Sequence, residues 1–333
     1  MKALLAIFAI LGVLSGACLV AWHGFAAVGA ALEVAGLPCL AAICAFQLVP
    51  LSLCALAWRA LFKKKRPDAS SFIWFRWMRD AGGDILGIVP AGGEMISIRA
   101  MTRRGTDMTM ATASTVVDLT MEMTSQAAFT ILGCILLLIE RPSSNLIAWT
   151  LAGIATIMFL AGAFALAQRF GLFRLLETLA GRLAVDKGWS YLSNVGGLHD
   201  RIHAIYADRP AIAAAVSIHF IAWIAGIGEA GIILAFMGVP MGLASLIMLE
   251  SLTYALRSAA FFVPAAAGVQ EGGYILVGAA LGLGPEFALA LSLMKRAREL
   301  TLGVTGLVVW QSIEGNSLLR ARSKARSRPR HRS

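Results

Sequence analysis

Val89-Pro90-Ala91-Gly92-Gly93-Glu94 interrupts an apolar segment that arginines flank on both sides. Proline removes a backbone donor and clashes with the preceding turn, and paired glycines free the backbone, so neither suits the interior of a helix. Non-helical backbone survives at membrane depth only where protein buries it or where it lines a wet cavity. A carboxylate such as Glu94 needs the same protection. The stretch therefore predicts a broken segment that is buried inside a membrane protein.

A second stretch repeats this pattern later in the chain: Val263-Pro264-Ala265-Ala266-Ala267-Gly268-Val269-Gln270-Glu271-Gly272-Gly273. Two broken, acid-bearing segments in corresponding halves of a membrane protein indicate a pseudo-repeat with a transport site between the halves. From these two segments we expect a substrate path that includes Pro90, Gly92, Gly93, Glu94, Pro264, Gly268 and Glu271.

The composition is that of an integral membrane protein. Of the 333 residues, 58% are hydrophobic and only 14% are charged, and the mean hydropathy is +0.75. The net charge of +10 does not indicate nucleic-acid binding, because the basic residues gather between apolar runs and in the C-terminal tail, as in loops on the cytoplasmic side. The predicted fold class is an all-α polytopic membrane protein.

Hydropathy predicts about eight membrane segments. The expected spans are Ala3–Trp22, Leu37–Phe62, Met110–Ile139, Leu146–Gln168, Ala211–Phe236, Met241–Val263, Tyr274–Leu283 and Pro285–Gln311. Basic residues on both sides of Gly82–Met101 favour a re-entrant hairpin there. The first apolar run is long for a signal peptide and lacks a clean cleavage site, so we expect a retained span. A second re-entrant hairpin in place of the short span Tyr274–Leu283 would put the basic tail outside, against the charge rule.

The sequence also predicts the domain limits, the helices in the loops and the state of the C-terminal tail. Residues 1–313 are expected to form one helical transmembrane domain, with cytoplasmic amphipathic helices over 169–210. The stretch from Arg320 to Arg332 alternates basic residues with Ser, Ala and Pro, and residues 314–333 are therefore predicted to be a disordered cytoplasmic tail. Ser70–Asp80 mixes aromatic and basic residues and is expected to lie at the level of the lipid headgroups. Both termini are then cytoplasmic.

Asp118 and Glu122 lie four residues apart in a predicted span and therefore face the same way. A charged residue at the centre of a span costs about 2.5–3.5 kcal/mol on insertion scales, so the pair implies a partner, protonation or water. Gln126 extends the same polar stripe. These groups either join neighbouring helices or line a functional path, and ionisable residues inside the membrane favour the second interpretation.

The later spans also carry charges. Glu250 and Arg257 share a face and could neutralise each other or one of the acids in the broken segments. Lys295, Arg296 and Arg298 interrupt the last span, where Glu299 cannot neutralise all three. Arg99 is a further deep cation. We predict that Arg296 lies near Glu271 in a central, partly wet cavity shared with Asp118, because a guanidinium holds a carboxylate through two bonds.

Other kinds of site find little support. The five cysteines all lie in apolar runs without CxxC or His-paired spacing, and the five histidines are scattered, so we expect neither disulfides nor a metal site. No phosphate-binding loop and no nucleophile elbow occurs. We therefore expect no cofactor and no enzymatic activity.

The motifs resemble a known family, the lysylphosphatidylglycerol synthase transmembrane or flippase-like family. The resemblance rests on Gly87-Ile88-Val89-Pro90-Ala91-Gly92-Gly93-Glu94 with Arg99-Ala100, and on Val263-Pro264, Gly268, Glu271-Gly272, Gly282 and Arg296. In much of the family the third span carries Glu-Arg and then Asp. This chain has Asp118-Leu119 and Glu122, so the arginine is missing. The run Val117–Glu122 with Gln126 is more similar to a hopanoid-biosynthesis-associated branch.

The resemblance implies a protein of the bacterial inner membrane that handles lipids, and only the flippase-like half of the family's larger enzymes. We expect this chain to translocate or transport an amphipathic lipid, with a hopanoid as the leading candidate. Membrane lipids are the expected partners, and lipid-biosynthesis enzymes are further candidates. Two alternatives stay open, a membrane scaffold for such enzymes and an ion-coupled transporter of a small solute.

Overall fold

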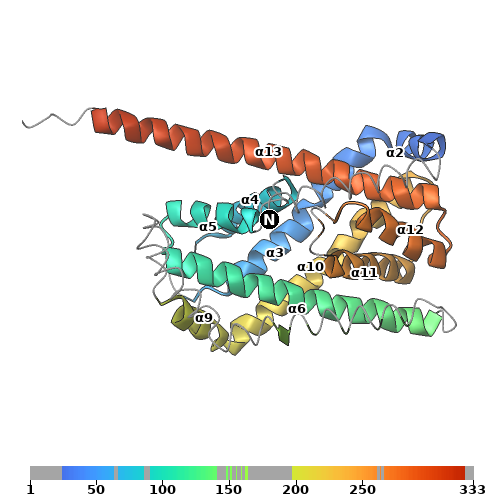
Figure 1. The fold of residues 1–333 in the computed structure, drawn as a ribbon, viewed down its shortest axis with the longest axis horizontal. Helices are drawn as coiled ribbons and strands as arrows, with labels where there is room; N and C mark the ends of the chain where they lie inside the picture. The colour runs from blue at the N-terminus through green and yellow to red at the C-terminus, as the bar shows by residue number, and fades with distance from the viewer. Residues whose placement is uncertain are drawn as a thin grey trace, which may run out of the picture.

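The computed structural model describes residues 25–63, 67–85, 91–140, 197–260 and 266–326, together with a few isolated positions. These ranges are helical apart from short connections, and they contain no strand, which confirms the predicted all-α class (Figure 1). The helices are α2 (Phe25–Phe46), α3 (Leu48–Ala60), α4 (Ala69–Ile85), α5 (Gly92–Arg103), α6 (Met108–Glu140), α9 (Leu198–Tyr206), α10 (Arg209–Phe236), α11 (Leu243–Ala259), α12 (Val269–Leu281) and α13 (Pro285–Arg326).

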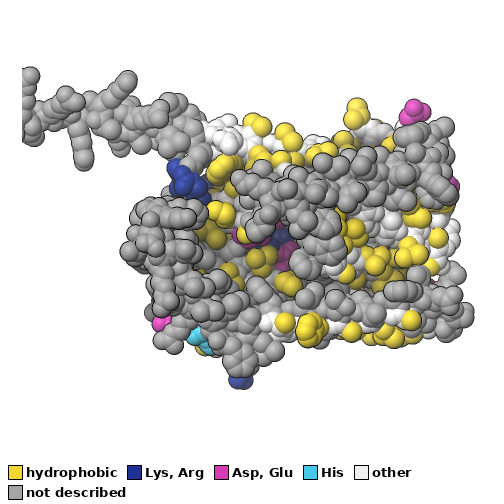
Figure 2. All heavy atoms as spheres, viewed as in Figure 1, with side chains coloured by type: hydrophobic (Ala, Val, Ile, Leu, Met, Phe, Trp, Pro, Cys, Tyr) yellow, Lys and Arg dark blue, Asp and Glu magenta, His cyan; other side chains and the backbone are white. Residues whose placement is uncertain are grey.

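Three described segments are long and apolar enough to cross a membrane: Leu32–Ala60, Met108–Glu140 and Arg209–Phe236. Large apolar side chains are also exposed on the outer faces of α6, α11 and α13, where Ile139 is 71%, Leu243 68% and Val308 58% exposed. Figure 2 shows such side chains spread over the body of the molecule. A soluble monomer rarely exposes so much apolar surface, so these faces are suited to lipid.

Several predicted span limits agree with the structure and others do not. α6 and α10 match the spans predicted at Met110–Ile139 and Ala211–Phe236 to within two residues. The span predicted at Leu37–Phe62 corresponds to the candidate span Leu32–Ala60, in which α2 and α3 meet at Gln47. α2 is kinked at Gly36, where φ is +64°. α11 is shorter than the predicted Met241–Val263. The predicted spans Ala3–Trp22 and Leu146–Gln168 lie outside the described residues, apart from isolated positions in the second.

α13 is longer than predicted. It continues through Arg326 and projects beyond the other helices, whereas the sequence analysis placed disorder from residue 314 (Figure 1). The physical reason lies in the composition of its last turns, Ser317–Arg326, which contain only Leu, Arg, Ala, Ser and Lys and no helix breaker. The proline at position 329 comes only after the helix has ended.

α4 and α5 form a tight hairpin whose helices approach closely at two glycines. A Cβ atom on Gly93 would lie 2.2 Å from the carbonyl oxygen of Arg79, and one on Gly82 would lie 2.7 Å from the Cα of Gly93. No side chain fits between the two backbones at this point. Gly93, one of the two glycines predicted to break the segment, therefore forms the contact between the two arms together with Gly82. Residues 86–90 lie outside the described residues.

The interpretation of Ser70–Asp80 as a membrane anchor is wrong for most of its side chains, because the neighbouring helices bury them. Phe72, Phe75 and Met78 on α4 are fully buried, and Arg76 and Arg79 are only 7% and 5% exposed. α4 packs against α3, α5 and α13. The arginines turn inward because carboxylates on α6 receive them there, so the mixture of aromatic and basic residues belongs to the interior.

Two apolar clusters flank a polar layer. One joins α3, α4 and α9 with the N-terminal parts of α6 and α10, and the other joins α2, α11, α12 and α13 with their C-terminal parts. α6 contributes Met121 to the first cluster and Phe129 to the second. α10 contributes Ala215 to the first and Ile227 to the second. The residues between these positions, including Glu122 and His219, form the polar layer.

The hairpin contact predicts the effect of two glycine substitutions. Gly93→Ala should destabilise the protein by about 1–3 kcal/mol, because the added methyl group overlaps the backbone of α4. Gly83→Ala is the matched control on the same hairpin, since a Cβ there meets nothing within 4 Å. It should leave stability unchanged or raise it by up to about 1 kcal/mol. Thermal unfolding of both variants in one detergent measures the difference, and equal midpoints would contradict the close approach.

Candidate functional site

The core of the site is a set of ion pairs between α4 and α6. Arg76 donates from Nη1 and Nη2 to both carboxylate oxygens of Glu122, at 3.0 and 2.7 Å. Arg79 donates from Nη1 to Asp118 Oδ2 at 2.6 Å and from Nη2 to Glu122. Arg76 Nε also lies 2.8 Å from Asp80. Bonds of this kind between guanidinium and carboxylate are among the strongest that side chains make.

Local helix geometry produces this match. Arg76 and Arg79 are three residues apart on α4, and Asp118 and Glu122 are four residues apart on α6, so each pair projects from one face of its helix. α10 joins them through His219, whose Nε2 lies 2.9 Å from Asp118 Oδ1 and whose side chain is fully buried. Asp118 therefore links three helices.

A second group of ion pairs connects α13 with α10 and α11, and a tyrosine on α12 adds a hydrogen bond to it. Lys295 Nζ lies 2.5 Å from Glu250 Oε2 and 3.5 Å from Glu229 Oε2. Arg298 Nε donates to Glu229 Oε1 at 2.7 Å. Tyr274 donates its hydroxyl to Glu250 Oε1 at 2.9 Å. Lys295 is buried, so these two carboxylates are what allow an ammonium group to remain there.

Glu271 forms a third group at the start of α12. Arg296 Nε donates to Glu271 Oε1 at 2.6 Å, and Arg296 Nη2 lies 3.4 Å from Oε2. The same carboxylate accepts the backbone N–H of Gly268 at 2.8 Å, which caps the helix. Gly268 has φ of +76°, a conformation that glycine adopts at little cost. Ser292 adds a further hydrogen bond.

A cavity of about 400 Å³ lies between the first two of these groups. It takes Arg76 and Arg79 from α4, Glu122 from α6 and Arg298 from α13. A smaller cavity of about 160 Å³ shares part of this lining and reaches Glu229. Figure 2 shows basic and acidic side chains in a recess near the middle of one face, among apolar side chains. The cavity thus offers charged groups to a ligand at the depth of the apolar helices.

Two carboxylates at this cavity have fewer or more distant cationic partners than the other carboxylates. Among the described residues, Glu94 has one cation within salt-bridge distance, Arg79 at 3.9 Å, and Asp84 has none. The ring of Trp223 also lines the cavity and packs edge-on against Tyr254 at 4.9 Å between centroids. The arrangement provides hydrogen-bond donors, acceptors and aromatic faces, which is suited to binding a polar group.

A larger cavity of about 990 Å³ lies where α3 and α4 meet the loop before α6 and the helix α9. Its rim carries opposite charges, including Lys63, which forms an exposed ion pair with Asp208 at 3.1 Å. Asp68 also lines it, and hydrogen bonds from Ser70 and Ser71 lower the pKa of the Asp68 carboxyl. Asp68 therefore stays ionised at neutral pH.

Comparison with known proteins gives one result. The sequence model of the family described as the lysylphosphatidylglycerol synthase TM region matches residues 6–306. The chain belongs to this family. No curated protein and no solved structure matches the chain. The matched region includes both broken segments and all three groups of ion pairs. Membership of the lysylphosphatidylglycerol synthase TM-region family suggests a membrane-lipid-related role.

The structure brings several predicted site residues together. Glu94, Glu122, Gln126 and Arg298 line the central cavity. Gln126 also donates to Ser258 on α11, at 2.5 Å. Gly92 and Gly93 are buried at the α4–α5 contact, and Arg99 is partly buried on α5. Pro90 and Pro264 lie outside the described residues.

Some predicted pairings differ. Arg296 contacts Glu271 as expected, but Asp118 is held by Arg79 and His219, and neither Arg296 nor Glu271 lines the cavity that Glu122 lines. The proposal of one cavity shared by Arg296 and Asp118 is therefore wrong, because Arg296 and Glu271 bind each other at the start of α12. Glu250 and Arg257 do not pair either. Glu250 binds Lys295, and Arg257 lies 3.6 Å from Glu299.

Sequence reasoning missed Arg76, Arg79 and His219 as parts of the site. It assigned the two arginines to the membrane surface and treated the histidine as scattered. A signal was available, because two arginines at i and i+3 and two acids at i and i+4 can match face to face. Nothing local to His219 indicated its partner, which lies 101 residues away in the chain.

The Glu271–Arg296 pair predicts a coupled effect on stability. Removing one member of a buried pair costs about 3–5 kcal/mol, because the other charge is left uncompensated. Glu271→Ala and Arg296→Ala should each lower the unfolding midpoint strongly, and the double variant should lose less than the sum. A double-mutant cycle on unfolding free energies measures this coupling. Strictly additive losses would show that the contact contributes nothing to the fold.

Proposed function

We propose that this protein translocates or transports an amphipathic lipid across or within the membrane, and that it is not an enzyme. The observation that carries the proposal is the charged cavity of about 400 Å³ between two apolar clusters in a membrane protein. A lipid needs an apolar route for its chains and a polar one for its headgroup. A cavity of this kind at the depth of the apolar helices serves the second need.

The energetics of the buried charges support transport over a scaffold. Placing ion pairs away from water costs more than packing apolar residues of similar size, so such pairs are weak evidence for stability alone. This protein keeps Arg76, Arg79, Lys295 and Arg298 almost fully buried. A scaffold for lipid-biosynthesis enzymes needs only outer surfaces that bind those enzymes, and no charged groups in its interior. A cavity that must receive a polar headgroup needs charged walls.

The two broken segments support an internal pseudo-repeat. Ala91 precedes α5 and Ala266 precedes α12, and both have positive φ, at +58° and +47°. Each helix then carries a glutamate at its third position, Glu94 and Glu271. Paired interrupted helices are typical of transporter halves. With these we propose about eight membrane segments, with both termini on the cytoplasmic side of a bacterial inner membrane.

The lipid that we propose is a hopanoid or another amphipathic lipid of similar build. The support for a hopanoid is the resemblance of the run Val117–Glu122 with Gln126 to the hopanoid-associated branch. Glu122 and Gln126 both line the cavity, so the residues that carry the resemblance lie where a headgroup would bind.

An ion-coupled transporter of a small solute is the second candidate. Two carboxylates at the cavity favour it, because such groups are suited to bind a cation or a proton. Among the described residues Asp84 has no cation within salt-bridge distance, and Glu94 has Arg79 at 3.9 Å. This candidate predicts movement of solute or charge without movement of lipid.

Reconstituted vesicles with a leaflet-sensitive labelled lipid test the function. The unaltered protein should accelerate exchange between leaflets. Glu122→Gln should reduce that rate by about tenfold or more, because a loss of about 1.4 kcal/mol in headgroup binding is already tenfold. Glu140→Gln is the matched control, since Glu140 is exposed at the end of the same helix.

Unfolding midpoints show whether the Glu122 variant keeps its fold. Parental exchange rates in a folded Glu122→Gln variant would remove the cavity from the lipid path. Absence of any exchange by the unaltered protein, with ion-dependent solute uptake in the same vesicles, would favour the second candidate instead. Lipid analysis of a deletion strain and its parent identifies the lipid class.

A further inference from the structure

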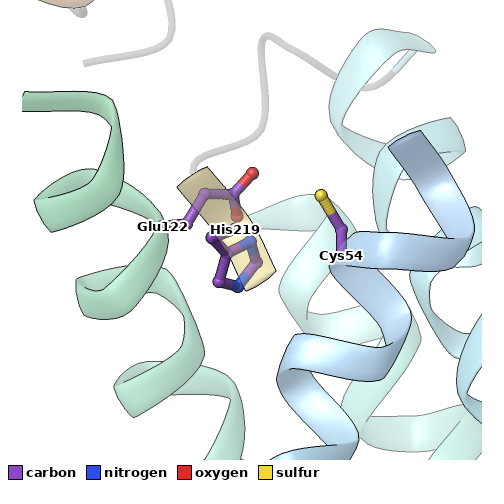
Figure 3. Close-up of side chains that lie close together, drawn as sticks. All are labelled: Cys54, Glu122 and His219. Carbon is purple, nitrogen blue, oxygen red and sulfur yellow. The ribbon is translucent and has the colours of Figure 1, made fainter. Parts of the chain in front are cut away.

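Three potential metal ligands from three helices converge beside the α4–α6 ion pairs. They are Cys54 on α3, Glu122 on α6 and His219 on α10, and their ligand atoms all lie within 4.8 Å of one another. Figure 3 shows the three side chains directed toward one shared space. Ligands of a tetrahedral zinc ion at 2.0–2.3 Å lie about 3.3–3.8 Å apart. The three donors therefore need to approach one another by at most about 1–1.5 Å.

His219 has one ring nitrogen free to bind a ligand. Its Nε2 lies 2.9 Å from Asp118 Oδ1, and Arg79 holds the other oxygen of that carboxylate. An ionised carboxylate only accepts hydrogen bonds, so Nε2 carries the proton. The lone pair of neutral His219 is then on Nδ1, which is buried and has no hydrogen-bond partner in the described part of the chain. A metal-bound imidazole usually donates its other ring N–H to a carboxylate in this way, which fixes the orientation of the ring.

Glu122 also retains a free acceptor position. Its Oε2 accepts bonds from Arg76 and Arg79, whereas Oε1 accepts one bond, from Arg76 Nη2 at 2.7 Å. Each carboxylate oxygen offers two lone pairs, so Oε1 has one left. The arginines fix the orientation of the carboxylate without using all of its capacity.

Cys54 completes the set from the opposite side. It is a free cysteine and is partly accessible. Together with Glu122 it lines the smaller cavity of about 160 Å³. A metal ion held by these three residues would keep one coordination position open to that cavity, as in zinc sites that bind a water molecule or a substrate.

The local charges are compatible with a divalent cation. The ion-pair group holds two cations, Arg76 and Arg79, and three carboxylates, Asp80, Asp118 and Glu122, so these five groups carry one net negative charge. A metal-bound histidine is neutral and a metal-bound cysteine is a thiolate, so Cys54 as a ligand adds a second. A divalent ion balances both, which matters in a buried site because uncompensated charge is costly there.

We propose that Cys54, Glu122 and His219 bind a zinc ion, with its open position facing the cavity. The sulfur, nitrogen and oxygen donors match the ligand preference of zinc and exclude magnesium and calcium, which take oxygen ligands. The site adds a Lewis-acidic group to the wall of the cavity. It does not depend on the proposed transport function, because metal binding is measured on the protein alone.

Cobalt binding to the purified full-length chain tests the site. A cobalt ion bound by a thiolate absorbs in the near ultraviolet, and oxygen or nitrogen ligands do not produce this charge-transfer band. The metal-stripped protein in detergent should show the band on titration with cobalt, and zinc should abolish it by displacement. Cys54→Ser should remove the band, whereas Cys44→Ser, at a partly exposed cysteine on α2, should keep it.

A second variant separates this site from adventitious surface binding. His199 and His203 on α9 lie 4.4 Å apart between ring centroids and could bind metal at the surface. His203→Ala should leave the cobalt band unchanged, and His219→Gln should weaken cobalt binding by about tenfold or more, as ligand-shell losses in metal sites do. No band in the unaltered protein, or a band that survives Cys54→Ser, would overturn the proposal. Vesicle transport can fail in either case without affecting this result.

Discussion

The pairing of two arginines on α4 with two carboxylates on α6 is the interaction on which the rest of the structure depends. Arg76 and Arg79 are almost fully buried, and so is Asp118. Breaking one buried partner leaves the other uncompensated, at a cost of about 3–5 kcal/mol. That constraint keeps α4 inside the helix assembly, where its amphipathic sequence alone would place it on a membrane surface.

The position of α4 in turn determines where the cavity forms. α5 follows α4 closely because glycines leave no side chain between their backbones, and this contact brings Glu94 to the cavity that Arg79 lines. α13 packs against α4 on the other side and brings Arg298. The polar layer is thus assembled from elements that are far apart in the chain, and the two apolar clusters close it at both ends.

The two broken segments show how a similar local pattern acquires different surroundings. Each places a glutamate at the third position of a helix that starts after a residue with positive φ. Glu271 finds a close cationic partner on the following helix, and its carboxylate also caps its own helix. Within the described ranges, the cation at salt-bridge distance from Glu94 is Arg79 on the preceding helix, at 3.9 Å. The first segment is therefore the one whose acid is available to a ligand.

The sequence by itself determined the features that depend on local properties. Hydropathy and helical period are properties of neighbouring residues, so the all-α membrane class and the limits of α6 and α10 could be predicted, as could the shared face of Asp118 and Glu122. The Arg296–Glu271 contact could also be predicted, because the two residues belong to a recurring motif and Arg296 lies on the helix that follows α12.

The tertiary structure decided which charges meet. Arg76 and Glu122 are 46 residues apart and His219 and Asp118 are 101 apart, so no local pattern indicates either contact. Lys295 binds Glu250, although Arg257 lies on the same helix as that glutamate. Cys54 lies in an apolar run that predicts only packing, yet helix packing places it beside Glu122 and His219. A buried ion is stable only beside its partner, and the way the helices pack determines which partner that is.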